Sequence, residues 1–117
     1  MAQPLIVIIE DDEGVRSALA RSLGQHGCDV RATATAAEGL KQLQKQAADL
    51  VLLDYRLPDA DGLELLETIR RRWPDLPVIM MTGVANVDTA VQAMHLGAYD
   101  YVSKPFGLDQ MTFVVNK

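Results

Sequence analysis

Two runs of apolar residues that each end in carboxylates constrain the fold of this chain more than any other feature. Residues 5–9 read Leu-Ile-Val-Ile-Ile and are followed by Glu10 and Asp11, and residues 50–53 read Leu-Val-Leu-Leu and are followed by Asp54. Continuous runs of branched residues are typical of strands that are covered on both faces, as in parallel sheets. Crowded carboxylates repel one another unless a cation lies among them, so the first run also suggests a divalent-metal site.

Segments with the apolar spacing of helices alternate with these runs and with further strands expected over 29–32, 78–81 and 99–103. Strands and helices that alternate in this way form βαβ units with right-handed crossovers. The sequence therefore predicts an α/β fold, a doubly wound five-stranded parallel sheet with helices on both faces. The strand over 29–32 is short and contains Arg31, which places it at an edge of the sheet.

Three of the expected helices carry specific predictions. The second begins at Thr35, which has capping-box spacing to Glu38. Its apolar face is formed by Ala36, Leu40, Leu43 and Ala47. In the fourth, the residues expected to face the core are Val87, Ala90, Val91 and Met94. A fifth helix begins at Leu108 and reaches Lys117 without a cap, so we expect the native protein to continue through this helix into an effector domain.

Length and charge exclude several classes of protein. The 117 residues suffice for one domain with a real core and are too few for two, so residues 1–117 are expected to form a single domain. The net charge of -5 disfavours binding of this segment to nucleic acid or to an anionic membrane. Cys28 is the single cysteine, which excludes a disulfide framework. Because there is neither a membrane-spanning run nor a signal peptide, we expect a cytoplasmic protein.

The carboxyl ends of the expected strands carry acidic, hydroxyl and amine side chains. Ligands of doubly wound sheets bind beyond the carboxyl ends of the strands. Those ends carry Glu10, Asp11, Asp54, Thr82 and Lys104. Three carboxylates and one ammonium leave an excess of negative charge, and a hard cation with oxygen ligands, best Mg²⁺, would offset it. The two histidines fall away from this edge, which argues against zinc.

With a metal bound, a carboxylate can attack phosphorus and form an aspartyl phosphate. Asp54 is the candidate nucleophile because it stands alone at its strand end, whereas Glu10 and Asp11 are paired as metal ligands would be. Phosphoryl transfer depends mainly on positioning and on cancelling charge, which Lys104 and the Thr82 hydroxyl can supply together with the metal.

These residues lie in motifs that resemble the receiver domain of two-component response regulators, the CheY-like family. The motifs are Glu10-Asp11, the stretch from Asp54 to Gly62, Thr82-Gly83 and Lys104-Pro105-Phe106. The resemblance implies the flavodoxin-like strand order 2-1-3-4-5. It also implies that Asp54 accepts a phosphoryl group from a sensor histidine kinase, so that the domain is a signalling phosphoacceptor and not an enzyme. The sequence of residues 97–106 is similar to the corresponding segment of the receivers of NtrC-type transcription regulators.

The resemblance assigns further roles. Mg²⁺ would be held by Asp11, Asp54 and the Arg56 carbonyl, with Glu10 acting through a metal-bound water. Thr82 and Tyr101 would form the switch pair, and the Lys104-Pro105 bond would be cis. Downstream, the domain would control an effector domain in the same chain, and a homodimer could form on phosphorylation through the fourth and fifth helices.

The lifetime of the phosphorylated state is expected to depend on two neighbouring positions. In receivers these lie two residues beyond the phosphorylated aspartate and two beyond the threonine, which are Arg56 and Val84 here. Val84 cannot orient an attacking water, and Arg56 can shield the phosphoryl group. The sequence therefore predicts slow self-dephosphorylation.

Functions of other classes fit the sequence less well. A phosphohydrolase of the haloacid-dehalogenase type also forms an aspartyl phosphate, but it would have an acid two residues after the nucleophile, where Arg56 stands. A nucleotide-binding module would have a glycine-rich loop after the first strand. A calcium loop with Gly62 at its sixth position would place Leu57 where an acid is required. A receiver that serves only as an interaction surface is disfavoured because all the key residues are present.

Overall fold

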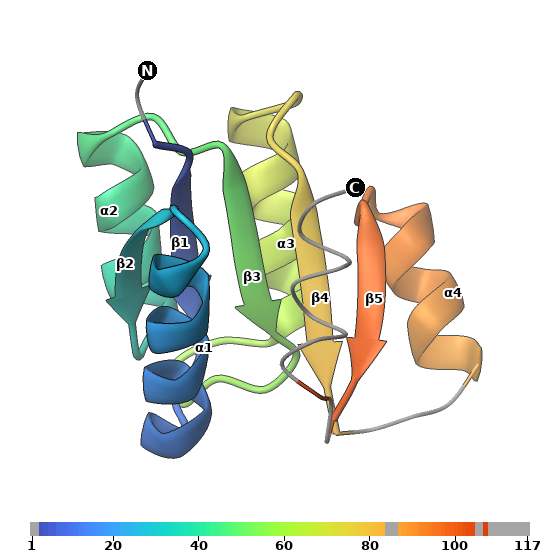
Figure 1. Ribbon diagram of the computed structural model, residues 1–117. Coiled ribbons are helices and arrows are strands. Elements are labelled where there is room, and N and C mark those ends of the chain that lie inside the picture. The colour runs from blue at the N-terminus through green and yellow to red at the C-terminus, as the bar shows by residue number, and fades with distance from the viewer. Residues whose placement is uncertain (1–2, 84–86, 105–106, 108–117) are drawn as a thin grey trace.

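A computed structural model describes residues 3–83, 87–104 and 107. Its five strands form one parallel sheet in the order β2-β1-β3-β4-β5 (Figure 1), which is the order that the family resemblance implied. The elements are β1 (Leu5–Ile9), α1 (Glu13–Gln25), β2 (Asp29–Thr33), α2 (Ala36–Lys45), β3 (Leu50–Asp54), α3 (Gly62–Arg72), β4 (Val78–Thr82), α4 (Val87–His95) and β5 (Asp100–Ser103).

Helices cover both faces of the sheet, as predicted. Figure 1 shows α1 on one face and α2, α3 and α4 on the other. Successive strand residues point to opposite faces, so Ile6 and Ile8 pack with Leu19 of α1, whereas Val7 and Ile9 belong to the cluster formed with α2, α3 and α4. Each fully buried Leu or Ile contributes about 1.5–3 kcal/mol relative to an exposed one. Two apolar layers therefore hold the strand ends in place.

The central and edge strands differ as the sequence predicted. All residues of β1, β3 and β4 are buried. β2 contains no fully buried residue and lies at the edge of the sheet. Thr35 caps α2 as its spacing indicated, since its hydroxyl accepts a hydrogen bond from the Glu38 amide at 3.1 Å.

The inward face predicted for α4 is wrong at Val91 and Met94, whereas Ala90 is half-buried and the side chain of Val87 lies outside the described residues. Val91 and Met94 are 47% and 50% exposed, whereas Ala93 is fully buried and Thr89 is 6% exposed. The helix is therefore rotated so that the small side chains of Ala93 and Thr89 face the core. A pattern that weighs large apolar residues points to the wrong face, because Ala93 has a weak apolar signal.

The apolar face predicted for α2 extends too far. Ala47 is exposed, and α2 ends at Lys45 because Gln46 adopts an extended backbone with φ -150° and ψ 133°. The fifth helix expected from Leu108 lies outside the described residues.

Candidate functional site

The carboxyl ends of the strands bring the predicted groups to one place. Glu10 directly follows β1, Asp54 and Thr82 are the last residues of β3 and β4, and Lys104 follows β5. A cavity of about 370 Å³ opens between these strand ends, and its lining consists of Asp11, Asp54, Tyr55, Arg56, Thr82, Gly83 and Lys104. Because the strands are parallel, their carboxyl ends lie at the same edge of the sheet, and four separate segments of the chain meet around a single cavity.

Three carboxylates converge at this cavity. Glu10, Asp11 and Asp54 each offer one oxygen, and these oxygens lie within 4.8 Å of one another. Glu10 is fully buried and Asp54 is 5% exposed, whereas Asp11 is exposed to solvent. A set of carboxylate oxygens with one ligand open to water fits Mg²⁺, which binds through few carboxylates and keeps several waters.

Lys104 is the cation that faces the carboxylates. Its ammonium forms ion pairs with Glu10 and, at 3.2 Å, with Asp54. Burial alone lowers the pKa of Lys104, but the hydrogen bond that its ammonium donates to Glu10 and the charges of Asp54 and Glu10 outweigh this effect, so the net shift is upward. Lys104 is therefore held in its charged form.

The phosphoacceptor candidate has a strongly perturbed carboxyl group. The pKa of Asp54 is raised to about 7, mainly by burial and further by the hydrogen bond and negative charge of Glu10, while Lys104 opposes the rise. Without a bound cation, one ammonium does not compensate two buried carboxylates. A cation at this place would favour the ionised, nucleophilic form of Asp54.

Thr82 and Tyr101 lie on neighbouring strands. The register pairs Met80 with Tyr101 and Thr82 with Ser103, so Tyr101 is a diagonal neighbour of Thr82. Burial raises the pKa of the Tyr101 hydroxyl, and a hydrogen bond with the Thr82 side chain opposes this rise. The two residues that the family resemblance named as a switch pair are thus in contact in this structure.

The loop after Asp54 is fixed at its base. The Tyr55 amide donates to the Met81 carbonyl at 2.8 Å, and the Gly62 amide donates to the Tyr55 carbonyl at 2.8 Å. A Cβ at Gly62 would lie 2.4 Å from the Tyr55 oxygen, so only glycine fits there. Arg56 forms an isolated antiparallel bridge with Asp61. The Arg56 backbone is therefore held beside the cavity, while its side chain is exposed.

Two residues of this region were missed by sequence reasoning. Arg16 of α1 donates to the carbonyls of Glu10 at 3.0 Å and Asp11 at 3.3 Å, and so orders the turn that carries both acids. Asp59 accepts hydrogen bonds from the start of α2. Neither residue lies at a strand end, and no spacing rule links them to the cavity. Val84 and Pro105, for which roles in lifetime and a cis bond were predicted, lie outside the described residues.

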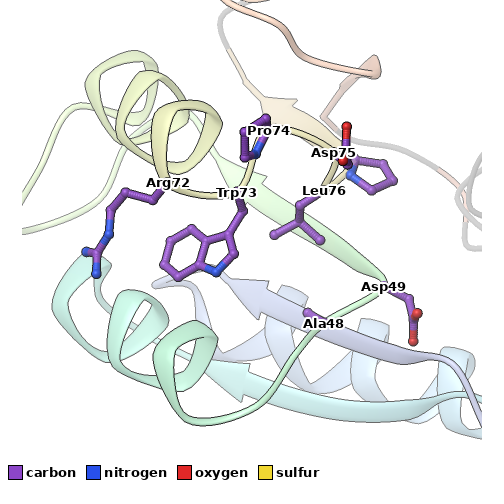
Figure 2. Close-up of a pocket in the computed structure, with 8 residues that line it drawn as sticks. Ala48, Asp49, Arg72, Trp73, Pro74, Asp75 and Leu76 are labelled. Atoms are coloured by element: carbon purple, nitrogen blue, oxygen red, sulfur yellow. The ribbon is translucent and has the colours of Figure 1, made fainter.

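A second cavity, of about 430 Å³, lies at the opposite end of the sheet. Figure 2 shows Trp73 and Leu76 directed toward the segment that contains Ala48. The Arg72 guanidinium lies 4.9 Å from the centroid of the Trp73 ring. The lining includes none of the three converging carboxylates, so this cavity is separate from the acidic site.

The sheet order and the acids, threonine and lysine at its carboxyl end define the class of flavodoxin-like α/β domains with an acidic site. A sequence model described as the response regulator receiver domain matches residues 6–116. The chain belongs to this family of receiver domains.

Relatives and solved structures agree with this assignment. The chain is 39% identical, over 94% of its length, to the DNA-binding transcriptional regulator NtrC of Proteus hauseri, and 40% identical, also over 94%, to the C4-dicarboxylate transport transcriptional regulatory protein DctD of Rhizobium meliloti. It spans only 23% and 24% of those two proteins. The fold is similar to a CheY-like receiver domain protein from Methanospirillum hungatei, with a TM-score of 0.93, 31% identity, and coverage of 98% of this chain and 92% of that one.

The receiver domain of NtrX from Brucella abortus is similar as well. Its TM-score is 0.90 at 36% identity, and the match covers 95% of this chain and 94% of that one. Together these matches show a receiver domain of the NtrC/NtrX type, which implies a phosphoacceptor role in two-component signalling. Among the helices that the structure describes, none is long and apolar enough to cross a membrane.

Proposed function

We propose that Asp54 accepts a phosphoryl group from the phosphohistidine of a sensor kinase, in a reaction that requires Mg²⁺, and that the phosphorylated domain switches an effector that regulates transcription. The observation that carries this proposal is the position of Asp54, which lies in the cavity lining with two further carboxylates and an ammonium within reach. The relatives NtrC and DctD are named as transcriptional regulators, which supports the proposed output.

The transfer would proceed by displacement at phosphorus. An Asp54 oxygen forms the new bond to phosphorus, the bond from phosphorus to the histidine nitrogen breaks, and its electron pair remains on the imidazole. Bound Mg²⁺ supplies positive charge that offsets the negative charge gathered on the transferring oxygens. The ligands proposed for it are Asp11, Asp54 and the Arg56 carbonyl, with Glu10 acting through water.

Other side chains would act on the phosphoryl group once it is attached. Lys104, which pairs with Asp54 at 3.2 Å in this structure, would transfer its ion pair to a phosphoryl oxygen. The Thr82 hydroxyl would donate to another oxygen. Thr82 forms a hydrogen bond with Tyr101 in this structure. Movement of the Thr82 hydroxyl toward the phosphoryl group would break that bond and allow the Tyr101 side chain, on β5, to turn inward.

The proposal is tested by incubating the protein with Mg²⁺ and acetyl phosphate and measuring its intact mass. One acid-labile phosphoryl group should be added, and Asp54→Asn should remove it because an amide is no nucleophile. Asp75→Asn, the same change at an exposed aspartate near the opposite cavity, is the matched control and should be phosphorylated normally. Phosphorylation of Asp54→Asn at unchanged yield would refute the assignment.

Magnesium binding has its own test. Asp11→Ala should abolish both Mg²⁺ binding and phosphorylation while the domain remains folded in EDTA, because Asp11 is a proposed ligand whose exposed side chain has no packing role. A sharp fall in the melting temperature of Asp11→Ala in EDTA would show a structural role instead.

We also propose that the phosphorylated state is long-lived. Arg56 lines the cavity, where it can lie across the phosphoryl group, and Val84 offers no acceptor for an attacking water. Val84→Glu should shorten the lifetime about tenfold, which corresponds to about 1.4 kcal/mol of barrier lowering. The measurement is loss of the phosphoryl mass over time from purified protein in Mg²⁺. Loss within seconds from the unmodified chain, or equal rates in both proteins, would contradict this account.

A further inference from the structure

The loop between β3 and α3 makes a long-range contact that the family motif does not explain. Asp59, at the tip of this loop, accepts hydrogen bonds from the Ala36 amide at 2.8 Å and from the Ala37 amide at 3.0 Å. Figure 1 shows the loop reaching across the carboxyl end of the sheet toward the start of α2. Both carboxylate oxygens are used, which also lowers the pKa of Asp59.

The contact completes the first turn of α2. The amides in the first turn of a helix have no partner within the helix. Here the third of them, from Glu38, donates to the Thr35 hydroxyl, and the first two, from Ala36 and Ala37, donate to Asp59. Asp59 thus acts as a second cap, supplied by a residue 23 positions away.

On the loop side, the contact is linked to the proposed metal site through a short, braced segment. The bridge between Arg56 and Asp61 and the hydrogen bond from Gly62 to Tyr55 close the base of the loop. Only two residues, Leu57 and Pro58, separate Arg56 from Asp59. A displacement of the tip would therefore pull on the Arg56 backbone, whose carbonyl is a proposed Mg²⁺ ligand, through a segment of only two residues.

On the helix side, the contact is linked to the strand that carries the acids. A Cβ at Gly39 would lie 2.4 Å from the Cδ1 of Ile9, so the absence of a side chain lets α2 pack closely on β1. Ile9 is followed by Glu10, whose amide donates to the Thr33 carbonyl at 3.0 Å. The start of α2 and the turn with Glu10 and Asp11 therefore belong to one packed unit.

We infer that Asp59 is a positioning residue, which holds the Arg56 carbonyl at a fixed separation from Glu10 and Asp11 by joining the β3–α3 loop to α2, and thereby sets the affinity for Mg²⁺. This inference rests on the proposed function. Asp59 itself is exposed and is not part of the cavity lining. Loss of the contact would remove none of the proposed ligands. It would only make the separation between the Arg56 carbonyl and the acids less fixed.

The experiment compares Mg²⁺ binding by the unphosphorylated protein and three variants, measured by calorimetric titration with MgCl₂. In Asp59→Ala the dissociation constant should rise roughly threefold to tenfold, less than the ~10- to 100-fold typical when a partner of a metal ligand is replaced. Asp59→Asn keeps one oxygen acceptor and should fall between Asp59→Ala and the parent. Asp75→Ala removes the same charge at the opposite end of the sheet and should leave the constant unchanged.

A second readout separates positioning from simple loss of stability. With acetyl phosphate, the phosphorylation rate of Asp59→Ala should be reduced at low Mg²⁺ and should return to within about twofold of the parent at saturating Mg²⁺. A variant with a lower melting temperature but an unchanged Mg²⁺ dissociation constant would overturn the inference. If the parent protein itself binds no Mg²⁺ and is not phosphorylated, the proposed function fails, and the inference fails with it.

Discussion

Charged side chains are buried at one end of the sheet and exposed to water at the other. At the carboxyl end, Glu10 and Asp54 are buried beside the ammonium of Lys104. At the other end, Arg72 and Asp75 border a cavity of similar size but remain exposed to water (Figure 2). Removing charge from water is costly unless it is paired, whereas exposed charges cost little and contribute little. The buried charges therefore reduce stability at the end where the chemistry is proposed.

The contrast gives a measurable expectation for the whole domain. Changes of charge at the carboxyl end should have large effects on stability and on phosphorylation. Equivalent changes at the opposite end should have small effects on stability and none on phosphorylation. The comparison weakens if any pair of matched variants reverses this order.

The largest effect on stability is expected for Lys104→Met. It removes the cation that faces Glu10 and Asp54 and leaves two buried carboxylates without a partner. Breaking a buried pair from one side costs about 3–5 kcal/mol, and the lower value applies here because the Lys104 side chain is 21% exposed. Urea unfolding in EDTA at pH 8 measures the loss in the free energy of unfolding.

The control for this variant is Lys41→Met, which changes an exposed lysine of α2. Its free energy of unfolding should stay within about 0.5 kcal/mol of the parent, as is usual for surface substitutions. Equal losses in Lys104→Met and Lys41→Met would show that the ion pairs at the carboxyl end do not support the fold.

The next effect concerns pH in the absence of metal. Burial and Glu10 raise the folded-state pKa of Asp54 to about 7. Because the folded state binds this proton more tightly than the unfolded state, the contribution to stability is complete below pH ~4 and is lost as pH rises through about 7. Between pH 5 and pH 8 the loss should be on the order of 2 kcal/mol, since each pKa unit corresponds to about 1.4 kcal/mol.

The sign of this effect is isolated by Asp54→Asn, which cannot ionise. Urea unfolding of both proteins in EDTA at pH 5, 6, 7 and 8 should give curves that diverge, with the parent falling relative to the variant as pH rises. Adding Mg²⁺ to the parent should remove most of the divergence, because the cation favours the charged carboxylate. Parallel curves would contradict the upward shift of the pKa.

The sequence was sufficient to predict the sheet and the residues around the cavity, and the reason is physical. Strands β1 and β3 are buried on both faces, which is what their continuous apolar runs indicate. Parallel pairing of these two strands then brings Glu10 and Asp54 together. The strand order itself came from the family resemblance. Thr82 and Lys104 were found by the same rule, because they end or follow strands of the same sheet.

What the sequence could not provide depends on packing across long distances. In α4 the buried positions are the small residues Ala93 and Thr89, and the spacing of the large apolar residues does not identify them. The contacts of Arg16 with the acid turn and of Asp59 with α2 depend on the direction of side chains that look like ordinary surface residues in the sequence. The burial that perturbs Asp54 likewise follows from the assembled structure.

The smallest effect is expected at the opposite end, for Arg72→Met. This change removes the contact between the guanidinium and the Trp73 ring, which lie 4.9 Å apart, and one of the basic residues in the last turn of α3. A cation–π contact at an exposed site contributes about 0.5–1 kcal/mol, so the free energy of unfolding should fall by no more than that. Phosphorylation by acetyl phosphate should proceed at the parent rate, because Arg72 lines the cavity at the opposite end of the sheet and Asp54 does not. The loss should also shrink little in 1 M salt if the methylene stem of Arg72 packs on the ring, whereas a mainly electrostatic contact would be screened. A loss comparable to that of Lys104→Met, or a slower phosphorylation of Arg72→Met, would mean that the two ends of the sheet are coupled and that the contrast between them does not hold.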